Sequence, residues 1–283
     1  MKPIPRFASR LRFSNLSFLL LLTLAGCGTS PPADSGSGGG VGQDYEAIQA
    51  QARQRDQEVA EAFRLDHAAD LPASAEEVLN RHLVAVGGRD AFDTIRTMVQ
   101  HFSAHSTAGS MGELVRYYKK PFLYRQKASA SPRAAVTDGD RFWMVGSEGW
   151  EEGTGENDYL PFLSMDNHVI VPETLGIVHE LVGVAAMDGD PGFQVRRIWP
   201  NGKEDLLYFS ALSGLLTAVR SEYPLMPDSW FSFWDYRDLG GVRIPYVHIR
   251  SIGEFGPPHG LVLQSVEINV PLPDSLFIPP SER

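Results

Sequence analysis

Two stretches of the sequence carry metal-binding residue types at spacings close to those of known metal motifs. His179 and Glu180 begin the pattern His-Glu-x-x-His, in which two histidines on one helical face bind zinc, but a glycine stands at position 183. Asp188 and Asp190 begin like a calcium-binding loop, yet the other oxygen ligands and the closing glutamate are missing. We therefore interpret the first stretch as part of a strand and the second as a hairpin turn, and we expect no metal site and no cofactor.

Acidic side chains gather around Trp150, between residues 148 and 158, in a glycine-rich stretch. Paired carboxylates beside an aromatic ring, here Glu151 and Glu152, could make a glycosidase site. Nothing in the sequence fixes their separation, so we favour a mobile acidic loop at the rim of a cavity. The sequence also lacks a Gly-x-Ser-x-Gly elbow and a phosphate-binding glycine loop. No catalytic nucleophile can be named, and we expect a protein without catalytic activity.

Cys27 is the one cysteine of the chain, and it follows an N-terminal segment typical of a secretory signal peptide. Basic residues without acids occupy positions 1–15, and an apolar run follows at 16–22. The run is too short for a permanent membrane span, which needs about 20 apolar residues. The sequence Leu-Ala-Gly-Cys at 24–27 resembles a bacterial lipobox. It implies cleavage before Cys27 and diacylation of the thiol.

The alternative is an ordinary signal peptide in which Cys27 is merely a small apolar residue. A lone cysteine would then carry an unpaired thiol into an oxidising compartment, whereas acylation removes that thiol. We therefore favour a lipoprotein. Two or more acyl chains give stable anchoring where one chain is marginal. Gly28 follows the cysteine where an aspartate could stand, and this favours the outer membrane, with the protein facing the periplasm.

The charge of the chain argues against two classes of partner. The 283 residues carry a net charge of −10, and removal of residues 1–26, which hold four basic residues and no acid, would make it −14. Nucleic-acid binding needs cationic surfaces, so it is not expected. Anionic headgroups would repel such a surface as well, which leaves the lipid on Cys27 to hold the protein at the membrane. The hydrophobic fraction of 43% is sufficient for the core of one large domain.

Composition and periodicity divide the chain into four parts. These are a signal peptide, the acylated cysteine with a flexible Gly/Ser/Pro linker, an N-terminal helix, and one large domain, at 1–26, 27–42, 43–70 and 71–283. In the last part, Ser74 and Glu77 form the pattern of a capping box at the start of a helix. Gly87 and Gly88 predict its end, and a short helical turn is expected at 90–94.

From Ile95 onward the hydrophobic period changes from 3.6 to 2, which predicts strands. Twelve strands are expected, at 95–106, 112–119, 122–130, 133–137, 141–146, 179–185, 193–200, 204–210, 215–222, 230–236, 242–252 and 261–270. Short connections, such as Pro-Asn-Gly at 200–202, imply an antiparallel meander. Strands such as 206–209 are apolar on both faces, so both faces are covered or one lines an apolar cavity. We expect a mainly β fold with helices (α+β), in which a strongly bent antiparallel sheet wraps the helices and leaves space for a ligand.

Aromatic side chains dominate the expected strand at 230–236. Alternation places Trp230 and Trp234 on one face and Phe231 and Phe233 on the other. Two-sided core packing is slightly favoured, and the alternative is that one face lines an acyl-chain cavity. In that interpretation Trp230 and Trp234 bind the ligand. An adaptable lip, Leu225 and Met226, and a lid in the long insertion, Phe162 and Leu163, contribute as well. Earlier strands add an aromatic wall, formed by Tyr117, Phe122, Tyr124 and Trp143.

Several stretches resemble the LolA/LolB-like superfamily of outer-membrane lipoprotein-sorting proteins. The residues at 75–91 resemble its opening helix, and those at 138–143, 207–216, 235–245 and 266–277 resemble later parts of it, in the same order and at similar spacing. The resemblance implies a bent, incomplete antiparallel barrel closed by helices, with an apolar cavity for acyl chains.

Such a fold implies a carrier or acceptor of lipoproteins or other lipids. The lipobox makes the anchored acceptor the closer parallel. Two alternatives from other classes remain open. One is a structural or sensing lipoprotein that fills its own cavity and binds a periplasmic protein partner. The other is a glycoside hydrolase that uses the acidic stretch at 148–158.

Overall fold

The computed structural model describes residues 40–120, 123–129, 134–138, 141–146, 149–152, 176–200, 202–223, 226–252 and 258–279. Helices in these ranges are α2 (Gly40–Asp66), α3 (Ala75–Ala85), α4 (Arg89–Thr94) and the 3₁₀ helix η3 (Asp274–Phe277). The strands are β1 (Thr97–Ser106), β2 (Gly109–Lys119), β3 (Leu123–Ala128), β4 (Ala134–Thr137), β5 (Phe142–Gly146), β6 (Gly149–Glu152), β7 (Val178–Met187), β8 (Asp190–Ile198), β9 (Glu204–Ser210), β10 (Leu216–Tyr223), β11 (Met226–Leu239), β12 (Val242–Ile252) and β13 (His259–Ile268).

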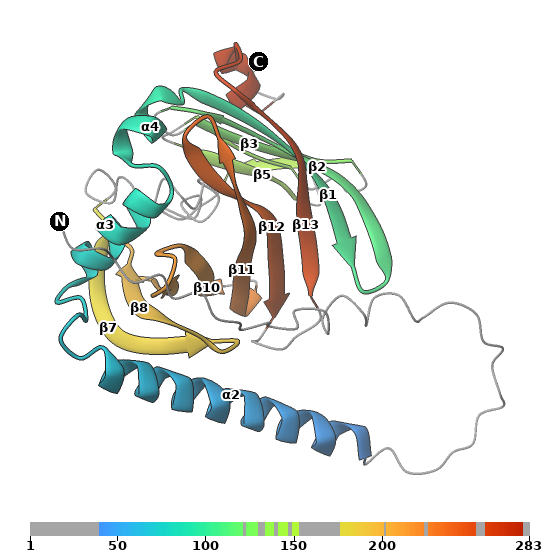
Figure 1. Ribbon diagram of the computed structural model, residues 1–283. Helices are drawn as coiled ribbons and strands as arrows, with labels where there is room; N and C mark the ends of the chain where they lie inside the picture. Colours follow the sequence, from blue (N-terminus) through green and yellow to red (C-terminus); the bar gives the residue numbers. More distant parts are fainter. Residues whose placement is uncertain are drawn as a thin grey trace, which may run out of the picture. The chain divides into compact units, whose positions relative to one another are not determined.

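All these strands belong to one antiparallel sheet of 13 strands, in the order β6-β5-β4-β3-β2-β1-β13-β12-β11-β10-β9-β8-β7 (Figure 1). Strands that follow one another in the sequence are neighbours in the sheet, except β6 and β7, which form its two edges. The first and last strands of the sequence, β1 and β13, pair in the middle of the sheet. The mainly β fold expected from the sequence, an antiparallel meander with few helices, is therefore confirmed.

The sheet curves toward one face until its distant parts meet. Tyr124 on β3 and Phe142 on β5 share a buried cluster with Ile177 and Trp199, which flank β7 and β8 near the opposite edge. Side chains on one face of such distant strands can touch only if the sheet bends toward that face. We call this face the concave face and the other the convex face. The strong bend expected from two-sided apolar strands is thus present.

Helices α3 and α4 lie on the concave face and bury two further clusters there. In the first, Val86 and Phe92 pack with Phe102, Leu114 and Ile244 from β1, β2 and β12. In the second, Ala75 and Val78 at the start of α3 pack with strands β8 to β11, mainly through phenylalanine, valine and leucine side chains. Burial of such large side chains contributes about 1.5–3 kcal/mol each.

Helix α3 begins as the sequence predicts. The Oγ atom of Ser74 accepts a hydrogen bond from the backbone N–H of Glu77 at 3.3 Å, as an N-cap residue does. The carboxylate of Glu77 accepts from the N–H of Ala73 rather than from that of Ser74, so the reciprocal bond is displaced by one residue. After the helix, Gly87 and Gly88 take φ angles of 116° and 86°, which glycine adopts without strain.

Helix α2 is held to the domain near its C-terminal end. The carboxylate of Asp56 accepts hydrogen bonds from the backbone N–H groups of Asp188 and Gly189 in the β7–β8 turn, at 3.1 and 2.8 Å. The ring of Phe63 lies edge-on to Phe193, at 6.2 Å between centroids. A polar clamp and an aromatic contact thus attach α2 to the β7–β8 hairpin.

On the convex face, the C-terminal segment covers strands β2 to β6. Phe277 of η3 is buried against Val136 and Trp143, with Tyr117 and Trp150 beside them. Arg125 donates to the backbone oxygen of Leu276 at 2.8 Å and so attaches η3 to the strand beneath it. The convex face of this half of the sheet is thus covered by protein.

Strand boundaries differ by a few residues from the sequence-based expectation at several places, and three differences have a clear structural reason. Strand β6 occupies part of the acidic stretch that we interpreted as a loop, because β5 offers it a pairing edge. Strand β11 runs from Met226 to Leu239, since Asp228 and Asp235 adopt positive φ angles within the strand instead of ending it. The turn after β7 is only Asp188-Gly189, a tight hairpin with both φ angles positive.

Candidate functional site on the concave face

A polar row crosses three neighbouring strands of the concave face. Gln100 on β1 pairs with Arg116 on β2, which pairs with Gln126 on β3. Paired residues of neighbouring strands lie on the same face, and Gln100 shares this face with Phe102, two residues further along β1. Phe102 packs against the α3–α4 side of the core. The row therefore faces the interior of the curved sheet.

Within the row, Gln126 orients Arg116 and leaves most of its donors uncommitted. The Oε1 atom of Gln126 accepts from the hydroxyl of Tyr124 at 2.8 Å and from Nε of Arg116 at 3.2 Å. The Tyr124 hydroxyl also lies within hydrogen-bond reach of the Arg116 guanidinium, whereas the remaining terminal N–H groups of Arg116 and the amide N–H₂ of Gln126 make no hydrogen bond in the described part of the chain. Burial raises the pKa of Tyr124 well above its ordinary value, so its hydroxyl stays protonated and donates.

Gln100 is the most enclosed member of the row. Its side chain is 7% exposed, and its amide group makes no hydrogen bond in the described ranges. The amide atoms are nevertheless not among the fully covered polar atoms without a partner. The amide atoms therefore keep a small contact with solvent, since a fully covered amide without a partner would cost about 1–3 kcal/mol.

An aromatic series continues from the polar row toward β11. The guanidinium of Arg116 lies 4.9 Å from the ring centroid of Phe102, within cation–π range. His248 packs edge-on against both Phe102 and Phe233, at 5.2 and 5.5 Å between centroids. Burial, and then the nearby Arg116, lower the pKa of His248 to about 3. His248 is thus neutral at ordinary pH, and its Nε2 atom, 3.1 Å from the carbonyl oxygen of Pro245, carries the proton.

A second polar cluster on the concave face is internally neutralised. The carboxylate of Asp205 accepts from Arg197 at 2.8 and 2.5 Å, from the indole N–H of Trp199 at 2.6 Å, and from the hydroxyl of Ser221. Burial, and then Arg197, lower the pKa of neighbouring His179 to about 4. Because its charges and acceptors are matched by protein groups, this cluster serves the structure at that end of the sheet.

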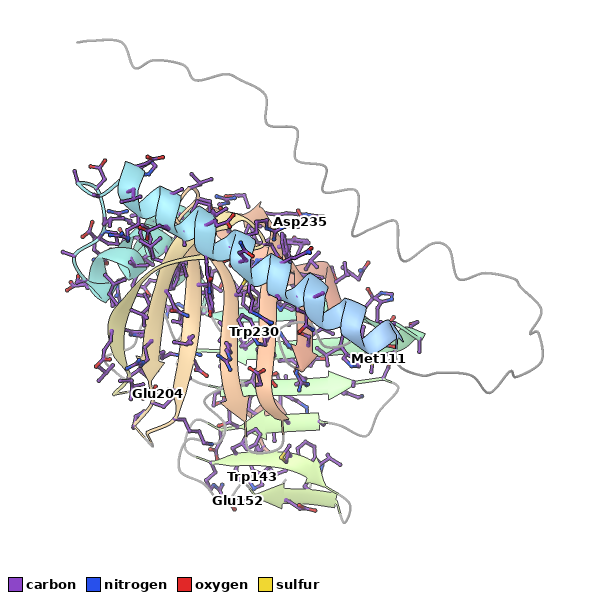
Figure 2. The ribbon with its side chains drawn as sticks, turned by 90° about the horizontal axis from the view of Figure 1, so that it is seen from below. Met111, Trp143, Glu152, Glu204, Trp230 and Asp235 are labelled. Atoms are coloured by element: carbon purple, nitrogen blue, oxygen red, sulfur yellow. The ribbon has the colours of Figure 1, made fainter. Side chains whose placement is uncertain are left out.

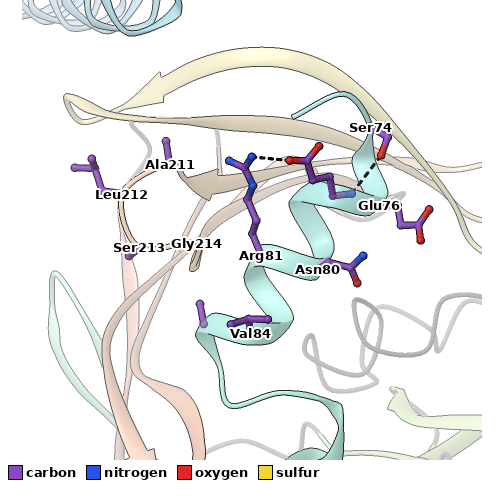
Figure 3. A pocket seen from close by; sticks show the side chains of 11 residues that line it. Ser74, Glu76, Asn80, Arg81, Val84, Ala211, Leu212, Ser213 and Gly214 are labelled. Carbon is purple, nitrogen blue, oxygen red and sulfur yellow. Dashed lines mark hydrogen bonds and ion pairs between the residues drawn. The ribbon is translucent and has the colours of Figure 1, made fainter. Parts of the chain in front are cut away.

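An open groove of about 740 Å³ lies between α3 and the β9–β10 turn (Figure 3). The ion pair between Arg81 and Glu77, at 2.6 Å, crosses its α3 side. Val84 and Leu212, which line it, are each 78% exposed, the highest values among the large hydrophobic residues in the described ranges. The groove is on the outside of the domain, separate from the polar row.

The predicted aromatic wall is divided between the two faces of the sheet. Tyr117 and Trp143 belong to the convex cluster under η3, and Tyr124 belongs to the concave cluster.

The alternation of side chains on β11 is as predicted, since Phe233 enters the concave core. Trp230 and Trp234 lie on the convex face, where Trp230 is buried beside Tyr208 and Trp234 is 46% exposed. Figure 2 marks Trp143 and Trp230 on their well-separated strands. The predicted residues do not form one wall.

The remaining predicted site residues fall outside the described part of the chain. These are Cys27, Phe122, Phe162, Leu163 and Leu225, together with the side chain of Met226 at the start of β11. The long insertion that contains Phe162 and Leu163 is described only from residue 176 onward, and Ile177 there is buried in the cluster that joins the two ends of the sheet.

The two acidic residues of the stretch 148–158 that the structure describes do not face a common point. Glu151 pairs with Met144 and Glu152 pairs with Trp143, so the two carboxylates lie on opposite faces of β6. A hydrolytic pair must flank one glycosidic bond. This arrangement does not provide such a pair.

Sequence analysis did not single out Gln100, Arg116, Gln126 or His248. A signal was present, because Arg116 alternates with Leu114 and Tyr118, which are apolar at the same parity of the strand. A charged residue among inward-facing apolar residues is unusual. Its significance depended on the strand register, which places glutamines on both sides of it.

Two searches of the described residues gave negative results. They contain no group of three or more metal-ligating side chains. Among their helices, none combines the length and the apolar character required to cross a bilayer.

No family model matches the chain, and no curated protein sequence matches it significantly. Solved structures similar to it include a DUF1329 family protein from Desulfovibrio piger, with a TM-score of 0.49, 12% identity and coverage of 72% of this chain and 95% of that one. Another is a LolA superfamily protein from Nitrosomonas europaea, with a TM-score of 0.47, 12% identity and coverage of 73% and 98%. A third is an outer membrane lipoprotein-sorting protein domain from Vibrio parahaemolyticus, with a TM-score of 0.47, 9% identity and coverage of 71% and 95%. At these identities the similarity concerns the fold alone.

Proposed function

We propose that this protein is a lipid-anchored envelope protein that holds an acyl-bearing ligand, a lipid or a lipoprotein, against the concave face of its sheet. It acts as a carrier or acceptor and catalyses no reaction. The observation that carries the proposal is the curvature of the sheet, which brings residues beside β3, β5, β7 and β8 into one cluster. Helices α3 and α4 cover the face through two other clusters. The intervening stretch carries half-buried aromatic residues and the unbonded amide of Gln100.

Burial of a chain on that face supplies the binding free energy in this proposal. Each methylene group removed from water contributes about 0.8 kcal/mol. The half-buried side chains of Met98, Tyr118 and Phe231 provide apolar surface on the described part of the face. The proteins of known structure that share the fold are named for lipoprotein sorting in one case and for the LolA superfamily in another, and acyl-chain binding is compatible with both names.

The ligand is tested by native mass spectrometry of residues 43–283, exported to the periplasm without the anchor. This segment contains every residue of the four hydrophobic clusters and lies within one compact unit. We expect a co-purifying acyl species, which Phe231→Asp, on the half-buried concave side of β11, releases and Trp234→Asp, on the exposed convex side, retains. A ligand-free mass together with no uptake of a fluorescent fatty acid would reject the proposal.

Such a negative result would favour the alternative of a binding module with a protein partner. The exposed side chains of Val84 and Leu212 in the groove beside α3 are the specific observation in its favour. In that case His248 and its aromatic neighbours simply fill the concave face with the protein's own side chains.

The anchor is part of the same proposal and rests on the sequence alone. We expect the wild-type protein to incorporate labelled palmitate and to fractionate with the outer membrane. Cys27→Ser removes both properties because the acceptor thiol is lost. Gly28→Asp is the matched control, which keeps the label and moves the protein to the inner membrane. Labelled Cys27→Ser would contradict the assignment.

A further inference from the structure

Arg116 is a half-buried cation that has no counter-charge in the described part of the chain. Its partners there are neutral: it donates to Gln126, lies within hydrogen-bond reach of the Tyr124 hydroxyl, and contacts the ring of Phe102. No carboxylate forms an ion pair with it there, and His248, the nearby titratable group, is neutral. Arginine remains protonated at all physiological pH values. An uncompensated charge in a partly desolvated position lowers stability, often by several kcal/mol.

Arg197 on the same face shows how this fold neutralises a buried arginine when the charge is structural. Its guanidinium binds Asp205 through two nitrogen atoms, and Trp199 and Ser221 occupy further acceptor positions of that carboxylate. Arg116 has glutamines on both sides where a carboxylate would serve the same purpose. The difference indicates that the partner of Arg116 comes from outside the chain.

We propose that Gln100, Arg116 and Gln126 form a binding site for the oxyanion headgroup of the ligand, a carboxylate or a phosphate. The free N–H groups of Arg116 bind two oxygen atoms of such a group. The amides of Gln100 and Gln126 add neutral donors on either side. Gln100 is the independent observation, because its enclosed amide makes no hydrogen bond within the described ranges and keeps a small contact with solvent.

The rows of side chains on either side of the polar row are apolar, as the acyl chain of an amphiphile requires. On one side of the polar row lies the apolar row Phe102, Leu114 and Ala128, and on the other lies Met98 with Tyr118 and Tyr124. Phe102, Leu114 and Tyr124 are buried in the core. A headgroup held at Arg116 therefore leaves its chain to lie along the half-buried members of these rows, Met98, Tyr118 and Ala128. The inference rests on the proposed acyl-binding function and specifies its ligand as an anionic amphiphile rather than a neutral one.

The experiment compares three probes of equal chain length, dodecanoate, dodecyl phosphate and dodecanol, each kept below its aggregation concentration. Binding to residues 43–283 is measured by displacement of a fluorescent fatty acid. We expect at least one of the two anions to bind tenfold or more tightly than dodecanol. The stronger of the two identifies the source of the headgroup, a free fatty acid or a phosphate-bearing lipid.

Arg116→Gln should remove the preference for the anion and leave the affinity for dodecanol unchanged. The matched control is Arg196→Gln. Arg196 is a half-exposed arginine on β8 that already pairs with Glu180 and Glu204 on the convex face. This control should retain the full preference.

Gln100→Leu provides a second variant that does not depend on Arg116. Its side chain makes no hydrogen bond in the described ranges, so the fold should tolerate the change, and the anion preference should fall several-fold. The melting temperature of Arg116→Gln should equal or exceed that of the wild type, since an unpaired charge is removed.

The results separate the two proposals. If the wild type binds all three probes equally, or if both variants keep the anion preference, the headgroup site is wrong while acyl binding stands. If the wild type binds none of the three probes, the proposed function itself fails and the headgroup site fails with it.

Discussion

Buried histidines are the residues whose chemistry depends most on this fold. His82 on α3 is 1% exposed, and burial lowers its pKa to about 4. Its Nδ1 atom lies 3.0 Å from the carbonyl oxygen of Gly214 and 3.1 Å from the N–H of Leu216. One ring nitrogen cannot donate and accept at once, so each tautomer of His82 makes only one of these two bonds. The residue joins α3 to the β9–β10 turn in its neutral form.

This burial predicts a loss of stability in acid. The unfolded chain binds a proton at His82 with a pKa near 6.5, and the folded chain does so only near 4. Between these values the unfolded state holds more protons, so the free energy of unfolding falls as the pH decreases, by at most about 1.4 kcal/mol per pH unit. His82→Gln should make the decline less steep, as measured by urea unfolding from pH 7 to pH 4.5.

A second measurement at pH 8 isolates the packing cost of His82→Gln, because the histidine is then neutral in both states. The prediction fails if wild type and variant lose stability in parallel over the acid range. His179 and His248, whose pKa values are also lowered by burial, account for the slope that remains in the variant.

At the scale of elements, the end of α3 is fixed against the β11–β12 turn. The backbone N–H of Arg243 donates to the carbonyl oxygen of Val86 at 2.8 Å. A Cβ atom at Gly87 would lie 2.0 Å from the carbonyl oxygen of Gly241, whereas one at Gly88 would meet nothing within 4 Å. Both glycines have positive φ angles. Gly87 and Gly88 therefore share the requirement for a positive φ angle, and only Gly87 lies in close contact with the backbone of the β11–β12 turn.

This difference predicts distinct effects for two similar substitutions. Gly88→Ala should cost about 1–2 kcal/mol, the usual strain of a positive φ angle in a residue with a side chain. Gly87→Ala should cost clearly more, because α3 must also move away from the backbone of the turn. Chemical denaturation of both variants measures the two costs. Equal destabilisation would show that the helix end is not in close contact with the turn.

At the scale of the whole molecule, the cluster around Trp199 joins parts of the sheet that are far apart in strand order. Trp199 follows β8, and it shares this cluster with Tyr124 on β3 and Phe142 on β5. Its indole also donates to buried Asp205. The curvature on which the proposed binding face depends is thus stabilised by contacts between residues distant in the sheet.

Removal of the Trp199 ring should therefore also destabilise strands β3 to β5, which are distant from it in strand order. Trp199→Ala is expected to lower the free energy of unfolding by about 3–5 kcal/mol and to speed amide hydrogen exchange in β3 to β5. Trp234→Ala is the control, because its exposed ring should contribute about 0.5 kcal/mol or less. Unchanged exchange in β3 to β5 after Trp199→Ala would mean that the two parts of the sheet are stable independently.

Local patterns in the sequence were enough to predict the local structure. Alternating apolar residues predicted the strands, and the Ser74 cap and the glycines after Val86 predicted α3, because these signals depend on near neighbours. The same locality explains the errors. Asp228 and Asp235 suggest strand ends, and only pairing with β10 and β12 shows that β11 continues through them. Strand β6 likewise depends on the edge that β5 presents.

The composition of the binding face was decided by tertiary structure. Alternation separates Trp230 from Phe231, but it does not say which parity faces inward, since that depends on the direction in which the whole sheet bends. The register of β1, β2 and β3 likewise brings Gln100, Arg116 and Gln126 into one row. Whether a charge is compensated is a property of neighbours distant in the sequence. The sequence by itself therefore determined the elements and predicted the lipid anchor. The folded sheet decided that Asp205 neutralises Arg197 and that Arg116 has no carboxylate partner in the described part of the chain.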